Sequence, residues 1–248
     1  MQQDFSGKVV IVTGAASGIG AAIVRDLVGR GGKAVVADFD ADGAERVARE
    51  LGGNARPFAV DVADAPQVKE MVAFALREFG RLDAAVNNAG ISGSSAPIGE
   101  TELENWHGVI DVNLHGVFYG MRYEIPAMLE TGGGAIVNMA SILGSVGWRG
   151  SVGYVAAKHA LLGMTKTAAL EYAAQGIRVN AVGPAFIATP LIEGAMDEDA
   201  LAGLVALHPA GRLGRADEVA AITNFLLSDA ASFVNGSYHP VDGGFLSQ

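Results

Sequence analysis

Short apolar runs alternate with longer helical patterns along this sequence, and no other feature limits the possible folds as strongly. The runs at residues 9–12 and 34–37 are apolar throughout, and each is followed by a segment with a helical pattern. Strands of this kind are buried on both faces, and their alternation with helices is typical of a parallel sheet covered by helices on both sides. We therefore predict a single α/β domain over residues 1–248, built on a doubly wound parallel sheet of about seven strands.

The pattern also gives approximate positions for these elements. Strands are expected at residues 9–12, 34–37, 56–60, 82–86, 134–139, 177–182 and 238–241. Helices are expected at residues 19–29, 43–51, 66–79, 102–130, 153–174 and 217–227.

The charge and the residue content exclude several classes of function. The formal net charge is −10 at pH 7 without any run of Lys or Arg, so nucleic acid is not an expected partner. The sequence has no cysteine, and its five histidines have no ligand spacing, so we expect no metal. No stretch approaches the ~18 apolar residues of a membrane span, and the first residues lack a signal-peptide pattern. We expect a cytoplasmic protein without membrane contact.

Residues 183–214 interrupt the alternation of strands and helices. They include three prolines, several glycines and an acidic stretch at residues 197–199. Long irregular insertions in compact domains are uncommon and often functional. We interpret this region as a substrate-binding lid, and a plain surface excursion is the alternative.

A glycine-rich turn follows the first predicted strand. Gly14, Gly18 and Gly20 form the pattern G-x-x-x-G-x-G directly before a predicted helix. Glycine permits a tight turn and a close approach of the main chain to a pyrophosphate, and the helix N-terminus offers free N–H groups. We therefore predict a Rossmann-type dinucleotide site that includes Ser17 and Ile19 as well as the three glycines.

Asp38 ends the second predicted strand. A carboxylate at this position can accept hydrogen bonds from the adenosine ribose hydroxyls, and it repels a 2′-phosphate. No Lys or Arg occupies positions 15–17 or 39 to pair with such a phosphate. We therefore predict NAD as the cofactor in preference to NADP. The alternative is an Asp that only begins the turn after the strand.

Tyr154 and Lys158 are four residues apart in an Ala-rich helical segment. On a helix this spacing makes two side chains neighbours. A nearby cation favours the ionised phenol, so we expect the pKa of Tyr154 to lie below its usual value of about 10. A phenol that exchanges a proton near neutral pH can act as a general acid or base. The same spacing also arises by chance on many helices.

In combination, these motifs resemble those of the short-chain dehydrogenase/reductase family over essentially the whole chain. The resemblance is carried in order by the glycine turn, Asp61-Val62, Asn87-Asn88-Ala89-Gly90, Asn113, Ser141, Tyr154-(x)3-Lys158 and residues 184–189. One departure is Ala185, because family members usually have glycine after the proline at this point. Because alanine tolerates fewer main-chain conformations than glycine, we expect this departure to alter the approach to a nicotinamide without abolishing its binding.

The resemblance implies four catalytic residues. Tyr154 would be the general acid/base, Ser141 would hydrogen-bond the substrate oxygen, and Lys158 would lower the phenol pKa and bind the nicotinamide ribose. Asn113 would hold a water that links Lys158 to solvent. The further cofactor contacts that it implies are Asp61 and Val62 at the adenine, Asn87 beside the adenosine ribose, Ala89 and Gly90 after it, and Ile187 and Thr189 at the carboxamide.

Three of these residues have a structural alternative when each is considered alone. Ser141 could cap a turn, Asn113 could bond helix main chain, and Asn87 could tie neighbouring strands together. The resemblance as a whole favours the functional interpretation.

The reaction that the resemblance implies is the NAD-dependent interconversion of a secondary alcohol and its ketone. The expected pocket walls (Ile142, Leu143, Trp148 and residues 91–96 and 184–207) are mostly apolar or small, which favours a hydrophobic or weakly polar substrate. An epimerase or dehydratase of the same fold and a non-catalytic dinucleotide-binding regulator are the alternatives. The resemblance also implies a homotetramer. One interface would pack through the helices at residues 102–130 and 153–174, and residues 241–245 would contribute to another.

Overall fold

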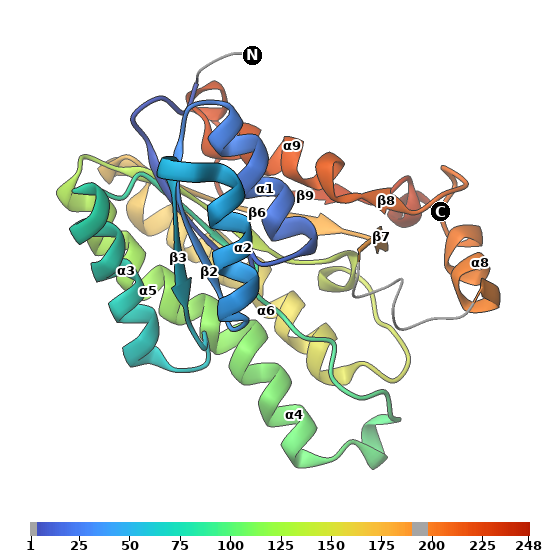
Figure 1. The fold of residues 1–248 in the computed structure, drawn as a ribbon. Coiled ribbons are helices and arrows are strands. Elements are labelled where there is room, and N and C mark those ends of the chain that lie inside the picture. Colours follow the sequence, from blue (N-terminus) through green and yellow to red (C-terminus); the bar gives the residue numbers. More distant parts are fainter. Residues whose placement is uncertain (1–3, 190–197) are drawn as a thin grey trace.

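The computed structural model describes residues 4–189 and 198–248, and in these residues a seven-stranded sheet runs through the molecule (Figure 1). The strand order is β3-β2-β1-β4-β5-β6-β9, and every neighbouring pair is parallel. The predicted doubly wound parallel α/β fold is confirmed. The strands are β1 (Val9–Thr13), β2 (Lys33–Asp38), β3 (Ala55–Ala59), β4 (Ala84–Asn87), β5 (Gly134–Met139), β6 (Ile177–Pro184) and β9 (Tyr238–Val241).

Helices cover both faces of this sheet (Figure 1). One face is packed by α1 (Gly18–Gly29), α2 (Ala41–Leu51) and α9 (Ala216–Leu227). The opposite face is packed by α3 (Ala65–Phe79), α5 (Gly116–Glu130) and α6 (Val152–Tyr172). Two further helices, α4 (Leu103–Ile110) and α8 (Glu198–Ala206), lie toward the periphery (Figure 1).

The burial of β1 explains why its sequence is apolar at every position. Val10 and Val12 face the α1 side and Ile11 faces the α3 side, and all three are completely buried. A strand with helices on both faces has no exposed side on which polar residues could alternate. The continuous apolar runs in the sequence therefore mark the interior strands.

Local signals in the sequence set several helix ends. The carboxylates of Asp40 and Asp64 accept hydrogen bonds from the amides of Gly43 and Gln67, and they cap α2 and α3. Helix α3 ends at Gly80, whose φ of +78° is in the left-handed region that favours glycine.

The helix predicted at residues 102–130 is interrupted in its middle. A π-helical segment at Asp111–His115 separates α4 from α5. A single π-helical turn has no recognisable signal of its own in the sequence, and such turns often occur at functional sites. This segment contains Asn113, one of the predicted catalytic residues.

The predicted lid region contains more regular structure than its sequence suggests. Strand β6 extends to Pro184, and the two short strands β7 (Ile187–Ala188) and β8 (Gly214–Arg215) pair in parallel. Helix α8 follows the residues that the structure does not describe. Part of the predicted lid, residues 190–197, lies outside the described residues, and its role as a lid stays a prediction.

Candidate active site

The predicted site residues gather at one edge of the sheet. Strand β1 leads into the glycine turn, β4 into residues 88–90, β5 into Ser141 and β6 into residues 185–189. These four strands are neighbours in the sheet, so the segments that follow their carboxyl ends lie next to each other. Open α/β sheets bind ligands at this edge.

The glycine turn has almost no room for side chains. Gly14 and Gly18 have φ values of +64° and +52°. A Cβ atom at Gly20 would lie 2.2 Å from the carbonyl oxygen of Gly14, and one at Gly14 would lie 2.9 Å from Cα of Ala89. Ser17 begins α1 without a side-chain cap, so its hydroxyl does not occupy the N–H groups of the first turn. The turn therefore fits a dinucleotide pyrophosphate.

Asp38 connects the end of β2 to the glycine turn. Its Oδ2 accepts a hydrogen bond from the amide of Ala16 (2.8 Å), and its Oδ1 accepts one from the amide of Asp40 (3.0 Å). A carboxylate accepts up to about four hydrogen bonds, so it retains capacity for a ribose hydroxyl.

A cation that the sequence analysis did not consider also faces the glycine turn. The guanidinium of Arg46, on α2, donates to the carbonyl oxygen of Ala16 at 3.5 Å. Because Arg46 is thirty residues from Ala16 in the chain, only the packing of α2 against the turn brings them together.

Asp61 and Val62 follow β3, and the Asp61 side chain binds main chain whereas the Val62 side chain is buried. Oδ1 of Asp61 accepts a hydrogen bond from the amide of Ala63 (2.9 Å). Val62 is buried and packs so closely on Gly116 that a Cβ there would lie 2.9 Å from a Val62 methyl group. Their contact with an adenine stays a prediction.

The side chain of Asn87 is turned into the core. Its amide nitrogen donates to Oε2 of Glu124 (3.1 Å) and to Oδ1 of Asn138 (3.2 Å), and Asn138 in turn donates to Thr165 (3.0 Å). Asn87 therefore ties β4 to β5 and α5, which is the structural alternative left open by the sequence. Any contact with the adenosine ribose would come from its main chain.

Ser141 follows β5, and its hydroxyl donates to the carbonyl oxygen of Pro184 at 3.5 Å. Its Oγ accepts a hydrogen bond from the amide of Leu143 (3.1 Å) and caps the 3₁₀ turn Ile142–Gly144. A further hydrogen bond links Ser141 to the phenol of Tyr154. The serine thus acts as a turn cap and also meets the predicted acid/base.

Lys158 and Tyr154 are neighbours on α6, as their spacing predicts. Nζ of Lys158 lies 5.3 Å from the centre of the Tyr154 ring. The ammonium is almost completely buried and donates to the carbonyl oxygen of Met139 at 2.7 Å.

Asn113 lies close to Lys158, but its side-chain amide forms hydrogen bonds with the main chain of Ile91. Its Oδ1 accepts from the amide of Ile91 (2.9 Å) and its Nδ2 donates to the carbonyl oxygen of Ile91 (2.7 Å). A Cβ at Gly90 would lie 2.7 Å from Oδ1 of Asn113 and 3.7 Å from Nζ of Lys158. Glycine at position 90 thus allows these groups to converge, and a water between them stays a prediction.

Burial dominates the electrostatics of the Tyr154–Lys158 pair. It raises the pKa of Tyr154, against the smaller lowering effect of the hydrogen bond with Ser141. It also lowers the pKa of Lys158 to about 8. The net shift of the Tyr154 pKa is therefore upward, opposite to the direction expected from the neighbouring cation alone. The sequence identifies the cation but not the loss of solvent around both groups.

Thr189 and Ile187 have opposite orientations in the segment after β6. The methyl group of Thr189 would lie 3.4 Å from a Cβ at Gly18, so Thr189 faces the glycine turn. Ile187 is buried in the core on the α1 side and packs on Gly214. A contact of Ile187 with the cofactor would come from its main chain.

Thr13 and Asn88 support the site, although neither is among the predicted site residues. Nδ2 of Asn88 donates to the carbonyl oxygens of Thr13 and Gly14 (2.9 and 3.1 Å). Oγ1 of Thr13 accepts from the amides of Asn88 and Ala89 (3.0 and 3.1 Å). These bonds fasten the turn after β1 to the turn after β4. The sequence signal for this role was the position of Thr13 and Asn88 next to the glycine-containing turns after β1 and β4.

Comparison with known proteins identifies the family. A family profile described as enoyl-(acyl carrier protein) reductase matches residues 14–246. Cyclohexanol dehydrogenase of Acinetobacter sp. (strain SE19) is 49% identical over 251 residues, which cover 100% of this chain and 98% of that protein. The chain belongs to the short-chain dehydrogenase/reductase family. It is therefore an oxidoreductase of a family that binds NAD(P).

Two further members of the short-chain dehydrogenase/reductase family are similar over nearly their full length. The 2,5-dichloro-2,5-cyclohexadiene-1,4-diol dehydrogenase of Sphingobium indicum is 46% identical, and the match covers 98% of each chain. The solved structure of 3-ketoacyl-(acyl-carrier-protein) reductase from Brucella melitensis, complexed with NADH, has a TM-score of 0.92 and 35% identity, and covers 97% of this chain and 99% of that one.

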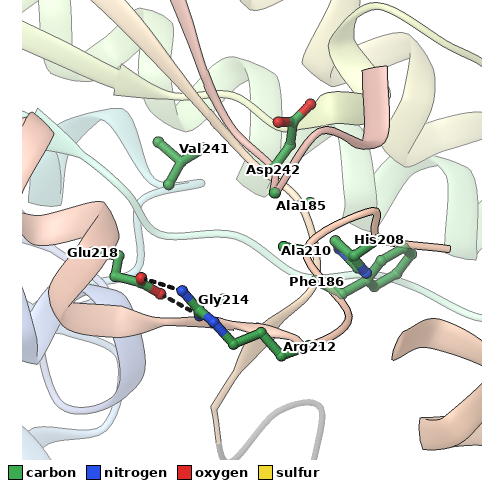
Figure 2. A pocket seen from close by; sticks show the side chains of 10 residues that line it. Ala185, Phe186, His208, Ala210, Arg212, Gly214, Glu218, Val241 and Asp242 are labelled. Carbon is green, nitrogen blue, oxygen red and sulfur yellow. Dashed lines mark hydrogen bonds and ion pairs between the residues drawn. The ribbon is translucent and has the colours of Figure 1, made fainter. Parts of the chain in front are cut away.

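In this dehydrogenase/reductase, a cluster of aromatic rings surrounds Phe186, which follows β6. The ring of Phe186 lies 5.4 Å from that of Trp148 and 5.8 Å from that of His208, and His208 also contacts Phe245. A cavity of about 130 Å³ lies beside this cluster, and its lining includes the Arg212–Glu218 ion pair (Figure 2). The lining of this cavity includes none of the four predicted catalytic residues.

Within residues 4–189 and 198–248, no group of three or more His, Asp or Glu side chains could hold a metal ion. In the same part of the chain, no helix is both long enough and apolar enough to cross a membrane.

Proposed function

We propose that this protein is an NAD-dependent dehydrogenase that interconverts a secondary alcohol and its ketone. The carrying observation is the phenol of Tyr154, which is hydrogen-bonded to Ser141 and lies beside the ammonium of Lys158. This group of side chains lies at the same sheet edge as the glycine turn, so a proton donor and a dinucleotide would meet there.

The roles of the residues follow from this arrangement. Bound NAD supplies the hydride chemistry. In reduction, Tyr154 donates its proton to the carbonyl oxygen, and in oxidation it removes a proton from the alcohol. Ser141 hydrogen-bonds the same oxygen and orients it between the two hydroxyls. Lys158 holds the nicotinamide ribose through N–H donors that the bond to Met139 leaves available.

The charges of the site bear on the direction of proton transfer. Burial keeps the phenol of Tyr154 protonated at neutral pH, which suits donation to a ketone. Because Lys158 has a pKa of about 8, it carries a positive charge over most of the neutral range and favours the phenolate that donation leaves behind.

The preference for NAD over NADP rests on Asp38. Its carboxylate ends β2 beside the glycine turn and would repel a 2′-phosphate while accepting a hydrogen bond from a ribose hydroxyl. Arg46 faces the same turn, so the preference depends on the charge of Asp38 rather than on a lack of cations.

We propose a six-membered alicyclic alcohol or ketone as the substrate. Two of the similar proteins bear the names cyclohexanol dehydrogenase and cyclohexadiene-diol dehydrogenase. The rings of Trp148 and Phe186, which are tilted by 58° to each other, offer an apolar wall next to the segment that contacts Ser141. An apolar ring buries its surface against such a wall without leaving polar groups unpaired.

The decisive test of the mechanism is Tyr154→Phe. This variant keeps the ring and removes the transferable proton, so NADH binding should be unchanged and turnover should fall about 10²- to 10⁴-fold. Tyr172→Phe, at the far end of the same helix, is the matched control and should retain turnover. NADH fluorescence titration and initial rates with cyclohexanone measure the two quantities. Full turnover by Tyr154→Phe would refute the mechanism.

A second experiment addresses the substrate and the cofactor. Rates with cyclohexanol and its acyclic counterpart hexan-2-ol, each with NAD and with NADP, should be highest for cyclohexanol with NAD. A higher efficiency with hexan-2-ol would exclude the ring preference, and a higher efficiency with NADP would exclude the cofactor assignment.

We also propose a homotetramer that packs through α5 and α6. Phe118 on α5 is 49% exposed and Leu170 on α6 is 85% exposed, and an interface through these helices would bury both side chains. Light scattering on the purified protein should give four times the mass of the chain, and Leu170→Lys should reduce it.

A further inference from the structure

Tyr238 connects the last strand of the sheet to the serine of the proposed site. It begins β9, and its hydroxyl donates a hydrogen bond to the main-chain carbonyl oxygen of Ser141 at 2.8 Å. The two residues are 97 positions apart in the chain. Tyr238 reaches Ser141 across β6, which lies between β9 and β5 in the sheet.

The ring of Tyr238 is fixed by the strand that it crosses. A Cβ at Gly183 would lie 2.2 Å from the Tyr238 hydroxyl oxygen and 2.3 Å from a ring carbon. The ring therefore lies directly on the main chain of β6, in space that only glycine leaves free. This contact aims the hydroxyl and limits the movement of the ring.

Ser141 depends on main-chain bonds for its orientation. Its carbonyl oxygen accepts hydrogen bonds from Tyr238 and from the amide of Gly144 (2.9 Å), and its Oγ accepts one from the amide of Leu143 (3.1 Å). The contact of Oγ with the carbonyl oxygen of Pro184 is longer, at 3.5 Å. The direction of the hydroxyl is therefore set mainly by the short turn after β5, which Tyr238 holds at its first peptide group.

The hydroxyl of Tyr238 is suited to permanent donation. Burial raises its pKa, against the smaller lowering effect of a hydrogen bond with Ser145, and the nearby Asp242 adds to the raising effect. The group therefore stays protonated over the working pH range. Its bond is directed at the carbonyl of Ser141 and not at a reacting oxygen. Tyr238 therefore differs in role from Tyr154, although both are phenols of one site.

We propose that Tyr238 is a positioning residue that holds Ser141 in register with Tyr154 and the substrate oxygen. This inference rests on the proposed function, because it assigns Tyr238 an effect on the same reaction. Loss of the Tyr238 hydroxyl frees the turn at Ser141 and weakens the hydrogen bond between Ser141 and Tyr154. That bond lowers the pKa of Tyr154, so its weakening raises this pKa.

The test is Tyr238→Phe, which keeps the ring against Gly183 and removes only the hydroxyl. We expect kcat for alcohol oxidation to fall about tenfold, the size of effect that one hydrogen bond can have. The pH at which oxidation reaches half its maximal rate should move upward, and KM for NAD should not change. Tyr172→Phe, also a partly buried tyrosine, should leave all three quantities at the wild-type values.

A double variant separates positioning from a general effect on the fold. If Tyr238 acts through Ser141, Tyr238→Phe should cost nothing further in a Ser141→Ala background. An additional tenfold loss in that background, or a wild-type kcat and pH profile for Tyr238→Phe alone, would overturn the inference. Neither result would affect the proposed acid/base role of Tyr154, which is refuted if Tyr154→Phe retains turnover.

Discussion

The ammonium of Lys158 donates a hydrogen bond to the carbonyl oxygen of Met139, two residues before Ser141, at a distance of 2.7 Å. Lys158 thereby fastens α6, which carries Tyr154, to the end of β5, which leads to Ser141. A single buried cation thus keeps the two hydroxyl groups of the proposed reaction on adjoining elements. The cost of this arrangement is the removal of a charge from water.

The first prediction is that Lys158→Met stabilises the free protein while it abolishes turnover. Burial lowers the Lys158 pKa from 10.5 to about 8, so the folded state disfavours the charged form. This penalty is fully present at pH 7 and disappears as the pH rises from about 8 to above 10.5. This penalty amounts to about 3 kcal/mol. The variant also loses the hydrogen bond to Met139, which offsets about 1 kcal/mol of the gain. We expect a gain of about 2 kcal/mol in the free energy of unfolding at pH 7.

Urea unfolding at pH 7 and pH 10 measures this gain, which should shrink at the higher pH. Lys166→Met, an exposed position on the same helix, is the control and should change the stability little at either pH. A variant that is less stable than wild type at pH 7 would contradict the prediction.

The second prediction concerns Glu124, which is completely buried against Asn87. Its Oε1 has no hydrogen-bond partner among the described residues, and burial raises its pKa from 4.5 to about 7. The folded state therefore favours the protonated acid, and stability declines as the pH rises from about 4.5 through 7. Glu124→Gln cannot ionise, so it should be within about 1 kcal/mol of wild type at pH 5 and about 3 kcal/mol more stable at pH 9.

Unfolding midpoints at pH 5, 7 and 9 test this dependence. Glu130→Gln, on the exposed side of the same helix, should show the same difference from wild type at all three values. A Glu124→Gln variant whose difference from wild type does not vary with pH would exclude a buried titrating carboxyl.

The third prediction uses the opposed charges at the glycine turn. Asp38→Asn removes the charge that would repel a 2′-phosphate and leaves Arg46 facing the same turn. We expect kcat/KM with NADH to fall and that with NADPH to rise, so that their ratio changes about 10- to 100-fold. Asp40→Asn, which has the same change of charge two residues away, should leave the ratio within about twofold.

The participation of Arg46 is tested by the double variant Asp38→Asn/Arg46→Gln. If the guanidinium pairs with the phosphate, the gain with NADPH should be lost. An unchanged gain would show that Arg46 has no part in it, and an unchanged ratio in Asp38→Asn would remove Asp38 from the choice of cofactor.

Much of the fold could be predicted because interior strands carry a strong sequence signal. The bounds of β5 are those expected, since it is a largely apolar run that begins at glycine and has a neighbouring strand on each side. The π-helical segment at Asp111–His115 has no such signal, because one wide turn leaves the apolar pattern of a helix intact. Strands β7 and β8 have two residues each, too few for a period to be visible.

The site was predictable where its geometry is local. Helical spacing alone makes Tyr154 and Lys158 neighbours. The partners of Asn87 and Ser141 could not be predicted, because Glu124 and Tyr238 are 37 and 97 residues away from them in the chain. The direction of the Tyr154 pKa also required the structure, since burial depends on the packing of several elements at once.

The last prediction is that alanine substitutions at two glycines of α1, Gly20 and Gly29, have very different effects on cofactor binding. In Gly20→Ala the new Cβ would lie 2.2 Å from the carbonyl oxygen of Gly14, so the turn itself must shift. In Gly29→Ala, at the other end of α1, the new Cβ meets nothing within 4 Å, and alanine is the better helix former. We expect the Kd for NADH to rise at least about tenfold in Gly20→Ala, which corresponds to about 1.4 kcal/mol of binding free energy. Gly29→Ala should bind NADH as wild type does and unfold at a slightly higher temperature. Fluorescence titration with NADH gives both constants, and equal affinities in the two variants would show that the close contact of Gly20 with Gly14 is not needed to hold the cofactor.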